Sequence, residues 1–248
     1  MADRFSRTRL LIGEEGLERL RNAHVAVIGL GGVGGYALEA LARAGVGRLF
    51  LADADIVEIS NVNRQILSLD STLGLPKADV ARERVRLINP NSVVHTTRDF
   101  LSADNIEALL PETVGYAVDA IDSILPKTHL IATLIKRNVC FVSCMGTASK
   151  LQPTGIRVAD LSETRACPLA RAVRQQLRRH GIRTGVRCVF SEENQGKTAA
   201  AEENDPNRKR IQGTISYIPG IAGLTAAGII INDILTSDGD WTDRGRKL

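Results

Sequence analysis

The sequence has few cysteines, little net charge and no apolar segment at its start. Its four cysteines form no CxxC pair, so neither a paired redox motif nor a CxxC zinc site is expected. The first residues, MADRFSRTRL, lack the apolar core of a signal peptide, which favours a cytoplasmic location. Lys and Arg number 32 against 28 Asp and Glu, an excess that allows an anionic partner without requiring one.

The chain does contain a strand, a glycine-rich turn, a helix and a second strand between His24 and Asp53. In the turn GLGGVG, Gly29 permits a tight bend, Gly31 lets the backbone approach a phosphate, and Gly34 allows helix and strand to pack closely. The amides at the start of the helix attract an anion. Asp53 is placed to accept hydrogen bonds from ribose hydroxyls. The pattern predicts an adenine-nucleotide site, and a helix whose glycines only aid packing is the alternative.

Apolar strand-like segments alternate with helical ones over the first 145 residues or so, which predicts an α/β fold with a Rossmann-like, doubly wound and mainly parallel sheet. We expect one domain over residues 1–248, with an N-terminal helical arm (1–22), a nucleotide-binding core (23–145) and a less regular substrate-side half (146–248). A helix is expected from Pro76 to about Ile88, and another from Ser102, as its N-cap, to Leu110.

In the second half, the polar stretch from Ser191 to Arg210 is expected to be a mobile crossover loop that serves as a lid. The apolar stretch from Tyr217 to Leu235 approaches the length of a membrane span, but Pro219 interrupts its start and Asn232 and Asp233 its end. It is expected to be a helix buried in the fold or at a dimer interface, with no integral membrane span; peripheral membrane association is left open.

Polar residues follow several of the predicted strands. Because parallel strands bring their carboxyl ends to one edge of a sheet, these residues are expected to surround one ligand. They are Gly34, Asp53, Arg64, Lys77 and Asp122.

Several segments together resemble a known family. The segments RFSRTRLLIG, VIGLGGVGG, LADADIVEISNVNRQ, GLPKADVARERVRLINP and VDAIDS resemble the ATP-dependent activating enzymes related to ubiquitin-activating enzymes, the ThiF/MoeB superfamily. Within it, DAIDS, PTGIRVADLSET and VRCVFSEE are most similar to the tRNA threonylcarbamoyladenosine dehydratases. The resemblance covers nearly the whole chain, and NxNRQ followed by a PK helix and DxxD is far more specific than the glycine pattern.

The resemblance implies that a substrate carboxylate attacks the α-phosphorus of ATP, giving an acyl-adenylate and pyrophosphate. In the dehydratases the carboxylate belongs to threonylcarbamoyladenosine in tRNA, and the neighbouring ureido group then closes a ring and releases AMP. Because ring closure benefits from proximity, it requires no further nucleophile.

The resemblance also assigns roles to individual residues. Arg64, Lys77 and Asp122 are implied as catalytic, Asp122 as a Mg²⁺ ligand with Asp119 as a structural residue, and Arg7 as an arginine finger that reaches the ATP of a second subunit in a homodimer. The implied ATP-binding set is Gly29, Gly31, Gly34, Asp53, Asp55, Asn61, Arg64, Lys77 and Asp122. No structural zinc is expected, because CxxC pairs are missing.

Two features of the second half have competing interpretations. Cys188 is either a nucleophile, as in related enzymes, or a small core residue. A set of arginines is either a tRNA-phosphate contact surface or a solvated basic face. These are Arg171, Arg174, Arg178 and Arg179.

Three other functions remain open on the sequence alone. The closest activates the C-terminal carboxylate of a ubiquitin-like sulfur-carrier protein by the same adenylation, with a sulfur-relay protein as partner. An NAD-dependent oxidoreductase would use the same glycine turn and Asp53. A non-catalytic nucleotide sensor would bind ATP without releasing pyrophosphate.

Overall fold

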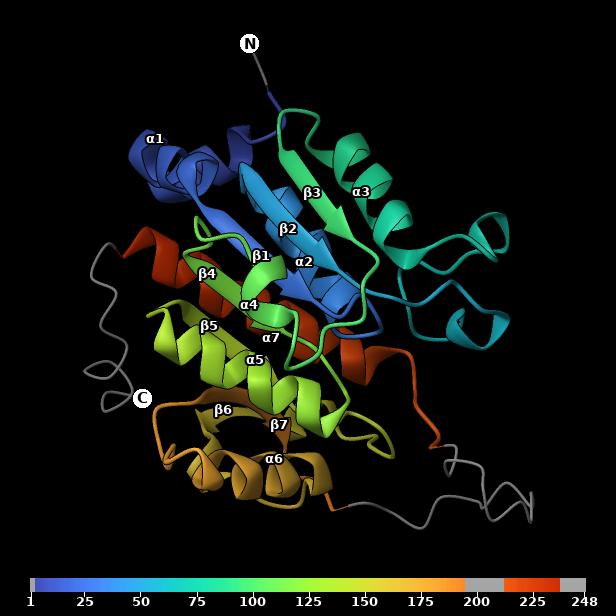
Figure 1. Ribbon diagram of the computed structural model, residues 1–248. Coiled ribbons are helices and arrows are strands. Elements are labelled where there is room, and N and C mark those ends of the chain that lie inside the picture. Colours follow the sequence, from blue (N-terminus) through green and yellow to red (C-terminus); the bar gives the residue numbers. More distant parts are fainter. Residues whose placement is uncertain (1–2, 195–211, 237–248) are drawn as a thin grey trace.

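The structure, a computed structural model, describes residues 3–194 and 212–236, and these form one seven-stranded sheet between two layers of helices (Figure 1). The strands are β1 (His24–Ile28), β2 (Arg48–Ala52), β3 (Val93–Thr97), β4 (Tyr116–Asp119), β5 (Cys140–Cys144), β6 (Ile156–Asp160) and β7 (Arg187–Ser191). Their order across the sheet is β3-β2-β1-β4-β5-β7-β6. All pairings are parallel except that between β6 and β7. The predicted α/β fold with a mainly parallel sheet is confirmed.

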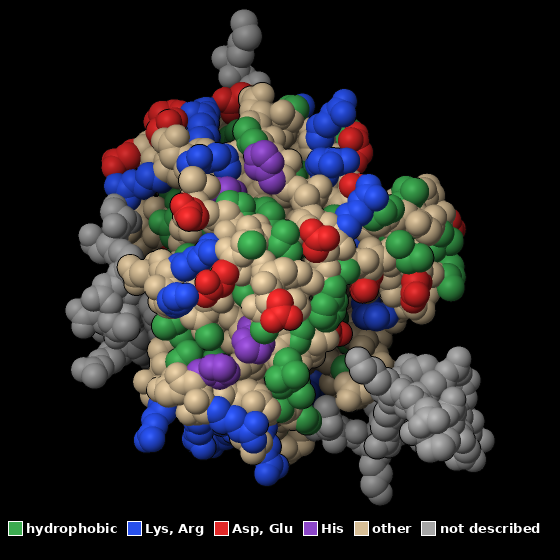
Figure 2. Space-filling view, in the orientation of Figure 1, with side chains coloured by type: hydrophobic (Ala, Val, Ile, Leu, Met, Phe, Trp, Pro, Cys, Tyr) green, Lys and Arg blue, Asp and Glu red, His purple; other side chains and the backbone are tan. Residues whose placement is uncertain are grey.

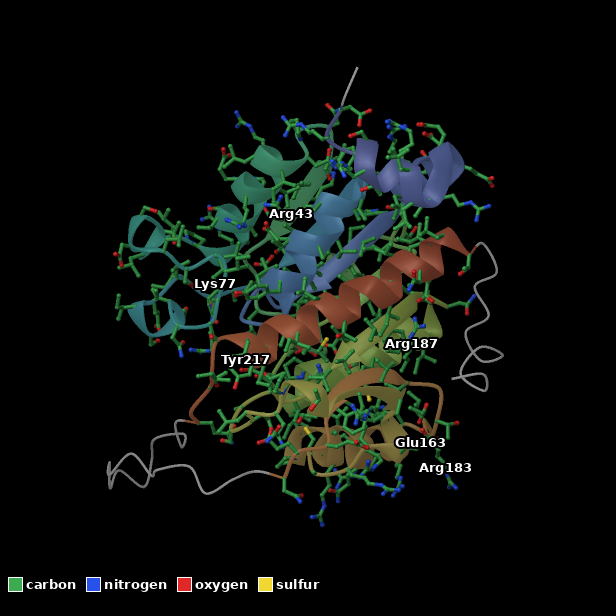
Figure 3. The ribbon with its side chains drawn as sticks, turned by 180° about the vertical axis from the view of Figure 1, so that it is seen from behind. Arg43, Lys77, Glu163, Arg183, Arg187 and Tyr217 are labelled. Carbon is green, nitrogen blue, oxygen red and sulfur yellow. The ribbon has the colours of Figure 1, made fainter. Side chains whose placement is uncertain are left out.

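Helices cover both faces of the sheet, because buried strands of a parallel sheet need apolar cover on each side. One face carries α1 (Ser6–Asn22), α2 (Gly34–Ala44), α3 (Lys77–Ile88) and α7 (Tyr217–Leu235), and the other carries α4 (Ile106–Leu109), α5 (Ile124–Lys136) and α6 (Pro168–Arg179). Four short 3-10 turns are η1 (Ile59–Asn61), η2 (Asp70–Thr72), η3 (Pro153–Gly155) and η4 (Leu161–Glu163). Figure 3 shows α7 crossing the sheet beside α2.

Helix α7 packs so closely on α2 that glycine is required at the contact. A Cβ atom added to Gly223 would lie 2.2 Å from the carbonyl oxygen of Val33, and Ala222, Ala226 and Ile230 of α7 are fully buried in the core. Among the described helices, α7 alone is long and apolar enough to cross a membrane, judged by length and composition. Its buried face and its contacts with α2 agree with the prediction of a helix buried in the fold.

The start of α4 and the segment after β7 were both the subject of sequence predictions. The helix predicted to start at Ser102 is wrong in its first half, because α4 begins only at Ile106. The backbone N of Ile106 still donates to the carbonyl oxygen of Ser102 at 3.1 Å, and Oδ1 of Asn105 accepts from the backbone N of Ser102 at 2.8 Å, so residues 102–105 form a capped turn before the helix. The expected mobile loop at 191–210 lies outside the described residues after position 194.

We expect that Gly34→Ala lowers the free energy of unfolding by about 3 kcal/mol or more, since a Cβ atom there would lie 1.7 Å from the carbonyl oxygen of Gly29. Gly228→Ala is the matched control: it lies in α7 with nothing within 4 Å of the added atom, and should gain up to about 1 kcal/mol from helix propensity. Urea denaturation of both variants measures the difference. Equal stabilities would contradict the packing described for the turn.

Candidate nucleotide-binding site

The glycine turn follows β1, whose neighbour in the sheet is β4. The connections that leave these two strands go to opposite faces of the sheet. The helix after β1 is α2, on one face, and the helix after β4 is α5, on the other. In open α/β sheets, such a switch point leaves a crevice at the carboxyl ends of the strands, where ligands bind. Gly29, with φ of +88°, lies so close to the next loop that an added Cβ would be 2.7 Å from the carbonyl oxygen of Ala120.

The three glycines of the motif are required for different reasons. Added Cβ atoms at Gly29 and Gly34 would collide with backbone atoms, so the fold itself demands glycine at both positions. At Gly31 the only described atom within 4 Å of an added Cβ, apart from those of the adjoining residues, is Nε2 of Gln65, at 3.8 Å. The fold leaves space above Gly31, as expected of a position where the backbone approaches a ligand.

Asp53, which follows β2, is fixed against the turn. Its Oδ2 atom accepts a hydrogen bond from the backbone N of Leu30 at 2.6 Å, and its Oδ1 atom accepts one from the backbone N of Asp55 at 2.9 Å. Burial raises the pKa of the Asp53 carboxyl, and this is opposed by the positive charge of Lys77 and by the two backbone hydrogen bonds. Each carboxylate oxygen has a second lone pair, so Asp53 retains capacity to accept a ribose hydroxyl.

Two cations flank the same turn. The Lys77 side chain is only 6% exposed, and its Nζ lies 2.8 Å from Oδ2 of Asp55, whose side chain is 72% exposed (Lys77 is labelled in Figure 3). Arg64 lies beside Gly32, with its Cγ 3.5 Å from the position of an added Cβ, and its Nη1 donates to Ser60 O at 2.9 Å. An anion that entered this site would compete with the Asp55 carboxylate for contact with Lys77.

Asn61 holds the loop that presents Arg64. Its side chain is buried, and its Oδ1 accepts a hydrogen bond from the backbone N of Glu58 at 3.2 Å. Its carbonyl oxygen accepts from the backbone N atoms of Arg64 and Gln65 at 3.1 and 2.9 Å. In this structure Asn61 therefore orders the turn of the NxNRQ motif.

The two acids after β4 have different environments. Asp119 is completely buried: its Oδ2 lies 2.9 Å from Nζ of Lys127, also completely buried, and accepts a hydrogen bond from Oγ of Ser143 at 2.6 Å. The backbone N of Ile121 donates to Oδ1 of Asp119 at 3.1 Å, and the carbonyl oxygen of Ile121 accepts from Lys127 at 2.9 Å. The pair therefore fixes the peptide groups that lead into Asp122, as the structural interpretation of Asp119 expects.

Asp122 itself is exposed, and its Oδ1 atom accepts a hydrogen bond from the hydroxyl of Ser123 at 3.3 Å. Within residues 3–194 and 212–236, no group of three or more His, Cys, Asp or Glu residues is arranged to hold a metal. Mg²⁺ commonly takes one or two protein carboxylates and completes its shell with phosphate oxygens and water. An exposed carboxylate such as that of Asp122, which makes only a weak contact with Ser123, fits that preference.

Arg7 lies near the amino ends of the strands, whereas the glycine turn of the same chain lies at their carboxyl ends. Helix α2 starts at the turn and ends at Ala44, and a Cβ added to the next residue, Gly45, would meet Leu17 at 3.2 Å and Phe5 at 3.4 Å. The 11 residues of α2 rise about 16 Å, and this length separates the start of α1 from the turn. Arg7 is the predicted site residue most clearly set apart from the others.

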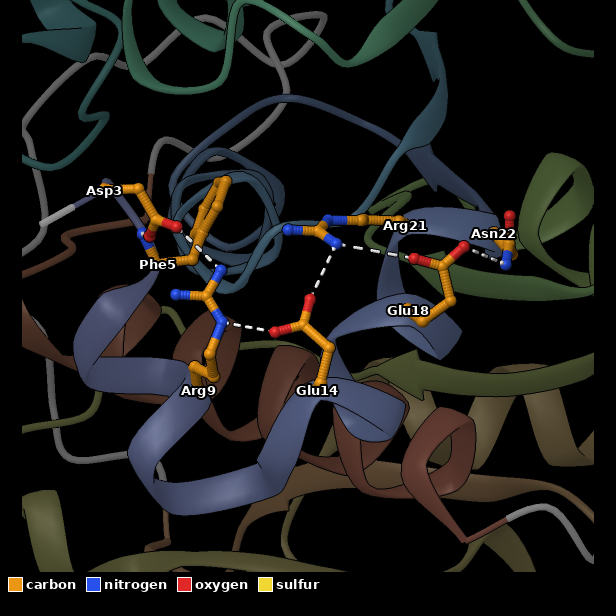
Figure 4. A network of polar contacts seen from close by, with 7 residues as sticks. All are labelled: Asp3, Phe5, Arg9, Glu14, Glu18, Arg21 and Asn22. Atoms are coloured by element: carbon orange, nitrogen blue, oxygen red, sulfur yellow. Dashed lines mark hydrogen bonds and ion pairs between the residues drawn. The ribbon is translucent and has the colours of Figure 1, made fainter. Parts of the chain in front are cut away.

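Of the arginines near the N-terminus, Arg7 is the one with no hydrogen bond or ion pair to any described residue. Arg4 donates to two carbonyl oxygens at the end of α3. Arg9 is held by Asp3 at 2.7 Å and by Glu14 at 2.5 Å (Figure 4). Arg7 is exposed and its charge is available to another molecule.

Cys188 lies in the core on β7, the strand that pairs with β5. Its side chain is fully buried, its Sγ lies 3.4 Å from the carbonyl oxygen of Ala159, and burial strongly raises the pKa of its thiol. A nucleophilic cysteine needs a thiolate and access to substrate. The geometry favours the packing interpretation over the catalytic one.

The arginines of α6 do not form one class. Nη1 of Arg174 donates to the carbonyl oxygen of Leu161 at 3.0 Å and to Oγ1 of Thr164 at 2.8 Å, so this side chain holds η4 against α6. Arg171, Arg178 and Arg179 are exposed. Figure 2 shows basic side chains gathered at the end of the molecule that α6 covers.

Sequence reasoning missed Lys127, Ser143 and Gln65 as contributors to the site. Lys127 is the one charged residue within the apolar stretch ILPKTHLIATLI, and that isolation was a usable signal of a buried partner. Ser143 ends an apolar strand and carried no comparable signal. Gln65 stood within the NxNRQ motif but received no role.

Comparisons with known proteins agree with this geometry. The model of the ThiF family matches residues 5–243. The tRNA threonylcarbamoyladenosine dehydratase of Bacillus subtilis is 40% identical over 243 residues, which cover 95% of this chain and 96% of that protein. Two crystal structures of the Escherichia coli dehydratase TcdA also match: the complex with AMP has a TM-score of 0.88 at 35% identity over 95% of both chains, and the complex with ATP has 0.84 at 34% identity over 99% and 96%.

Lys127→Met should lower the free energy of unfolding by about 3–5 kcal/mol, because it leaves the Asp119 carboxylate buried without its cation. Lys136→Met, on the same helix, is the control: its ion pair with Glu107 is exposed, and losing it should cost about 1 kcal/mol or less. Urea denaturation separates the two cases. If Lys127→Met costs no more than Lys136→Met, the pair does not hold this loop.

Proposed function

The chain belongs to the ThiF family, and from that membership we propose that it is an ATP-dependent dehydratase of threonylcarbamoyladenosine in tRNA. The observation that carries the proposal is the likeness to bacterial dehydratases along 95% of the chain, which extends beyond the nucleotide-binding half. The site geometry supports the same chemistry, since a glycine turn, two cations and an exposed carboxylate lie at the carboxyl ends of the strands.

In the proposed reaction, an oxygen of the threonyl carboxylate attacks the α-phosphorus of ATP. The bond from that phosphorus to the bridging oxygen breaks, pyrophosphate leaves, and an acyl-adenylate forms. The ureido group of the same nucleoside then attacks the activated carbonyl carbon, a ring closes, and AMP leaves. The net change is loss of water from the nucleoside, with ATP converted to AMP and pyrophosphate.

The chain's own residues would divide the work as follows. Gly31 leaves room for a phosphate, and Asp53 accepts hydrogen bonds from the ribose. Arg64 and Lys77 stabilise the negative charge that grows on pyrophosphate as it leaves. Asp122 would hold Mg²⁺, which when bound supplies further positive charge at the phosphates.

The proposal includes a homodimer. Because α1 lies at the far edge from its own glycine turn, Arg7 can serve an ATP site only if that site belongs to a second copy of the chain. The freedom of Arg7 from intramolecular partners among the described residues supports this role, since Arg4 and Arg9 are already engaged.

The proposal also includes a tRNA contact surface on α6. The start of this helix adjoins the loop after β5, because Sγ of Cys167 lies 3.6 Å from the position of an added Cβ at Gly146. Arg171, Arg178 and Arg179 are offered as phosphate contacts, with binding that weakens steeply as salt is raised. Arg174 is withdrawn from this set, because its guanidinium is hydrogen-bonded within the fold. A cytoplasmic location belongs to the same proposal.

We expect this protein, with ATP and Mg²⁺, to convert threonylcarbamoyladenosine in tRNA to a nucleoside lighter by the mass of one water. Asp122→Ala should lower the rate by about a hundredfold or more, since the carboxylate that would hold the metal is lost. Mass spectrometry of nucleosides isolated under mild conditions, which keep the ring closed, measures the product. Asp104→Ala, which removes an exposed acid outside the site, is the control.

An unchanged nucleoside mass would contradict the dehydratase assignment. If AMP then formed only after addition of a ubiquitin-like sulfur carrier, the assignment would move to adenylation of that protein. ATP binding without pyrophosphate release in either assay would indicate a nucleotide sensor.

Mixing two inactive variants tests the exchange of Arg7 between subunits. If Arg7 acts on the partner's site, refolding Arg7→Ala together with Asp122→Ala should restore about a quarter of the wild-type activity, because half the dimers are mixed and each has one complete site. Refolding Arg7→Ala with the double variant Arg7→Ala/Asp122→Ala should restore none. Absence of recovery in the first mixture would rule out action across the dimer.

A further inference from the structure

Gln65 is a buried polar residue whose side chain has no partner among the described residues. It is 6% exposed, and its Oε1 atom is shielded from solvent without a hydrogen bond. A polar atom buried in this way destabilises the folded protein, and native structures keep few of them. Such an atom calls for an explanation, and a ligand that supplies the missing partner is one.

The backbone holds Gln65 in a defined position. Its N atom donates to the carbonyl oxygen of Asn61 at 2.9 Å, and its own carbonyl oxygen accepts from the backbone N of Ser68 at 3.0 Å. The side chain extends from this turn to the glycine motif, where Nε2 lies 3.8 Å from the position of an added Cβ at Gly31. No other described atom outside the immediate neighbours of Gly31 comes within 4 Å of that position.

The other unpartnered groups do not share this location. Nε2 of His24 is buried at the start of β1, where Nδ1 of the same ring lies 2.9 Å from Oγ1 of Thr113. Oγ of Ser68 lies three residues beyond Gln65, and no contact joins it to the glycine turn. Gln65 is the described residue that combines an unpartnered buried atom, Oε1, with a side chain that reaches Gly31 through its other polar atom, Nε2.

The neighbouring contacts indicate which part of a nucleotide would occupy that space. Asp53, proposed to bind the ribose, is hydrogen-bonded at 2.6 Å to the N atom of Leu30, the residue before Gly31. The α-phosphate is joined to the ribose through a single oxygen, so a phosphate placed over Gly31 is the α-phosphate. This step rests on the proposed function, in which the α-phosphorus is the atom attacked.

We infer that the Gln65 carboxamide binds the α-phosphate of ATP, with Nε2 donating a hydrogen bond to a non-bridging oxygen. A carboxamide also offers an acceptor, so Oε1 can pair with a hydroxyl or water of the bound nucleotide. As a neutral donor aimed at the phosphate that is attacked, Gln65 helps to stabilise the charge on its oxygens as the new bond forms. The same contact persists in the acyl-adenylate and in AMP.

The test uses Gln65→Met in the full-length chain, which keeps the length of the side chain and removes its polar atoms. Titration calorimetry should show AMP and ATP bound about tenfold more weakly or worse, with adenosine affinity unchanged. The melting temperature of the nucleotide-free variant should rise by about 2 °C or more, because the unpartnered group is gone. A merely structural glutamine would give the opposite change in melting temperature.

Ser68→Ala is the matched control, since it removes another buried and unpartnered polar atom of the same segment and should leave AMP affinity unchanged. Unchanged AMP affinity in Gln65→Met, an equal loss for adenosine, a loss for ATP alone, or a lower melting temperature would each overturn the inference. If the wild type binds AMP but forms no cyclised nucleoside, the proposed function fails while the Gln65 contact stands. If the wild type binds neither AMP nor ATP, both fail.

Discussion

The site depends on one buried ion pair, between Lys127 of α5 and Asp119 at the end of β4. Neither side chain reaches water, so the two charges are tolerable only together and only with their further hydrogen bonds made. Those bonds reach Ser143 on the next strand and both peptide groups of Ile121. The pair therefore joins two central strands, a covering helix and the loop that carries Asp122. The glycine turn packs against that loop, because Gly29 lies close to the carbonyl oxygen of Ala120.

The sequence allowed prediction of the features that depend on local or periodic patterns. Alternating strands and helices, the glycine turn, Asp53 at the end of β2 and the helix after Pro76 all have signatures within a few residues. The start of α4 was mispredicted because residues 102–105 form a single turn before the helix, and sequence patterns place a helix boundary only to within a few residues.

The contacts that decide roles within the site are mostly tertiary, and spacing does not reveal them. Arg174 and Arg178 are alike in sequence context, yet one is hydrogen-bonded to η4 and the other is exposed. The glycines of the turn differ in the same way: a side chain at Gly34 would collide with the backbone oxygen of Gly29, whereas one at Gly31 would meet no described backbone atom beyond its neighbours. The separation of Arg7 from its own turn likewise follows from the direction of α2 through the fold.

The pairing of Lys77 with Asp55 has a consequence for selectivity among anions. Positive charge alone does not distinguish a nucleotide from orthophosphate and other small anions of the cell. An anion that approaches Lys77 competes with the Asp55 carboxylate, which already lies 2.8 Å from the Nζ atom. In the proposed function, a nucleotide would engage Asp53, the glycine turn and Arg64 together with Lys77, whereas a small anion would engage one cation. The Asp55 carboxylate would thus favour a ligand that makes several contacts over a small anion.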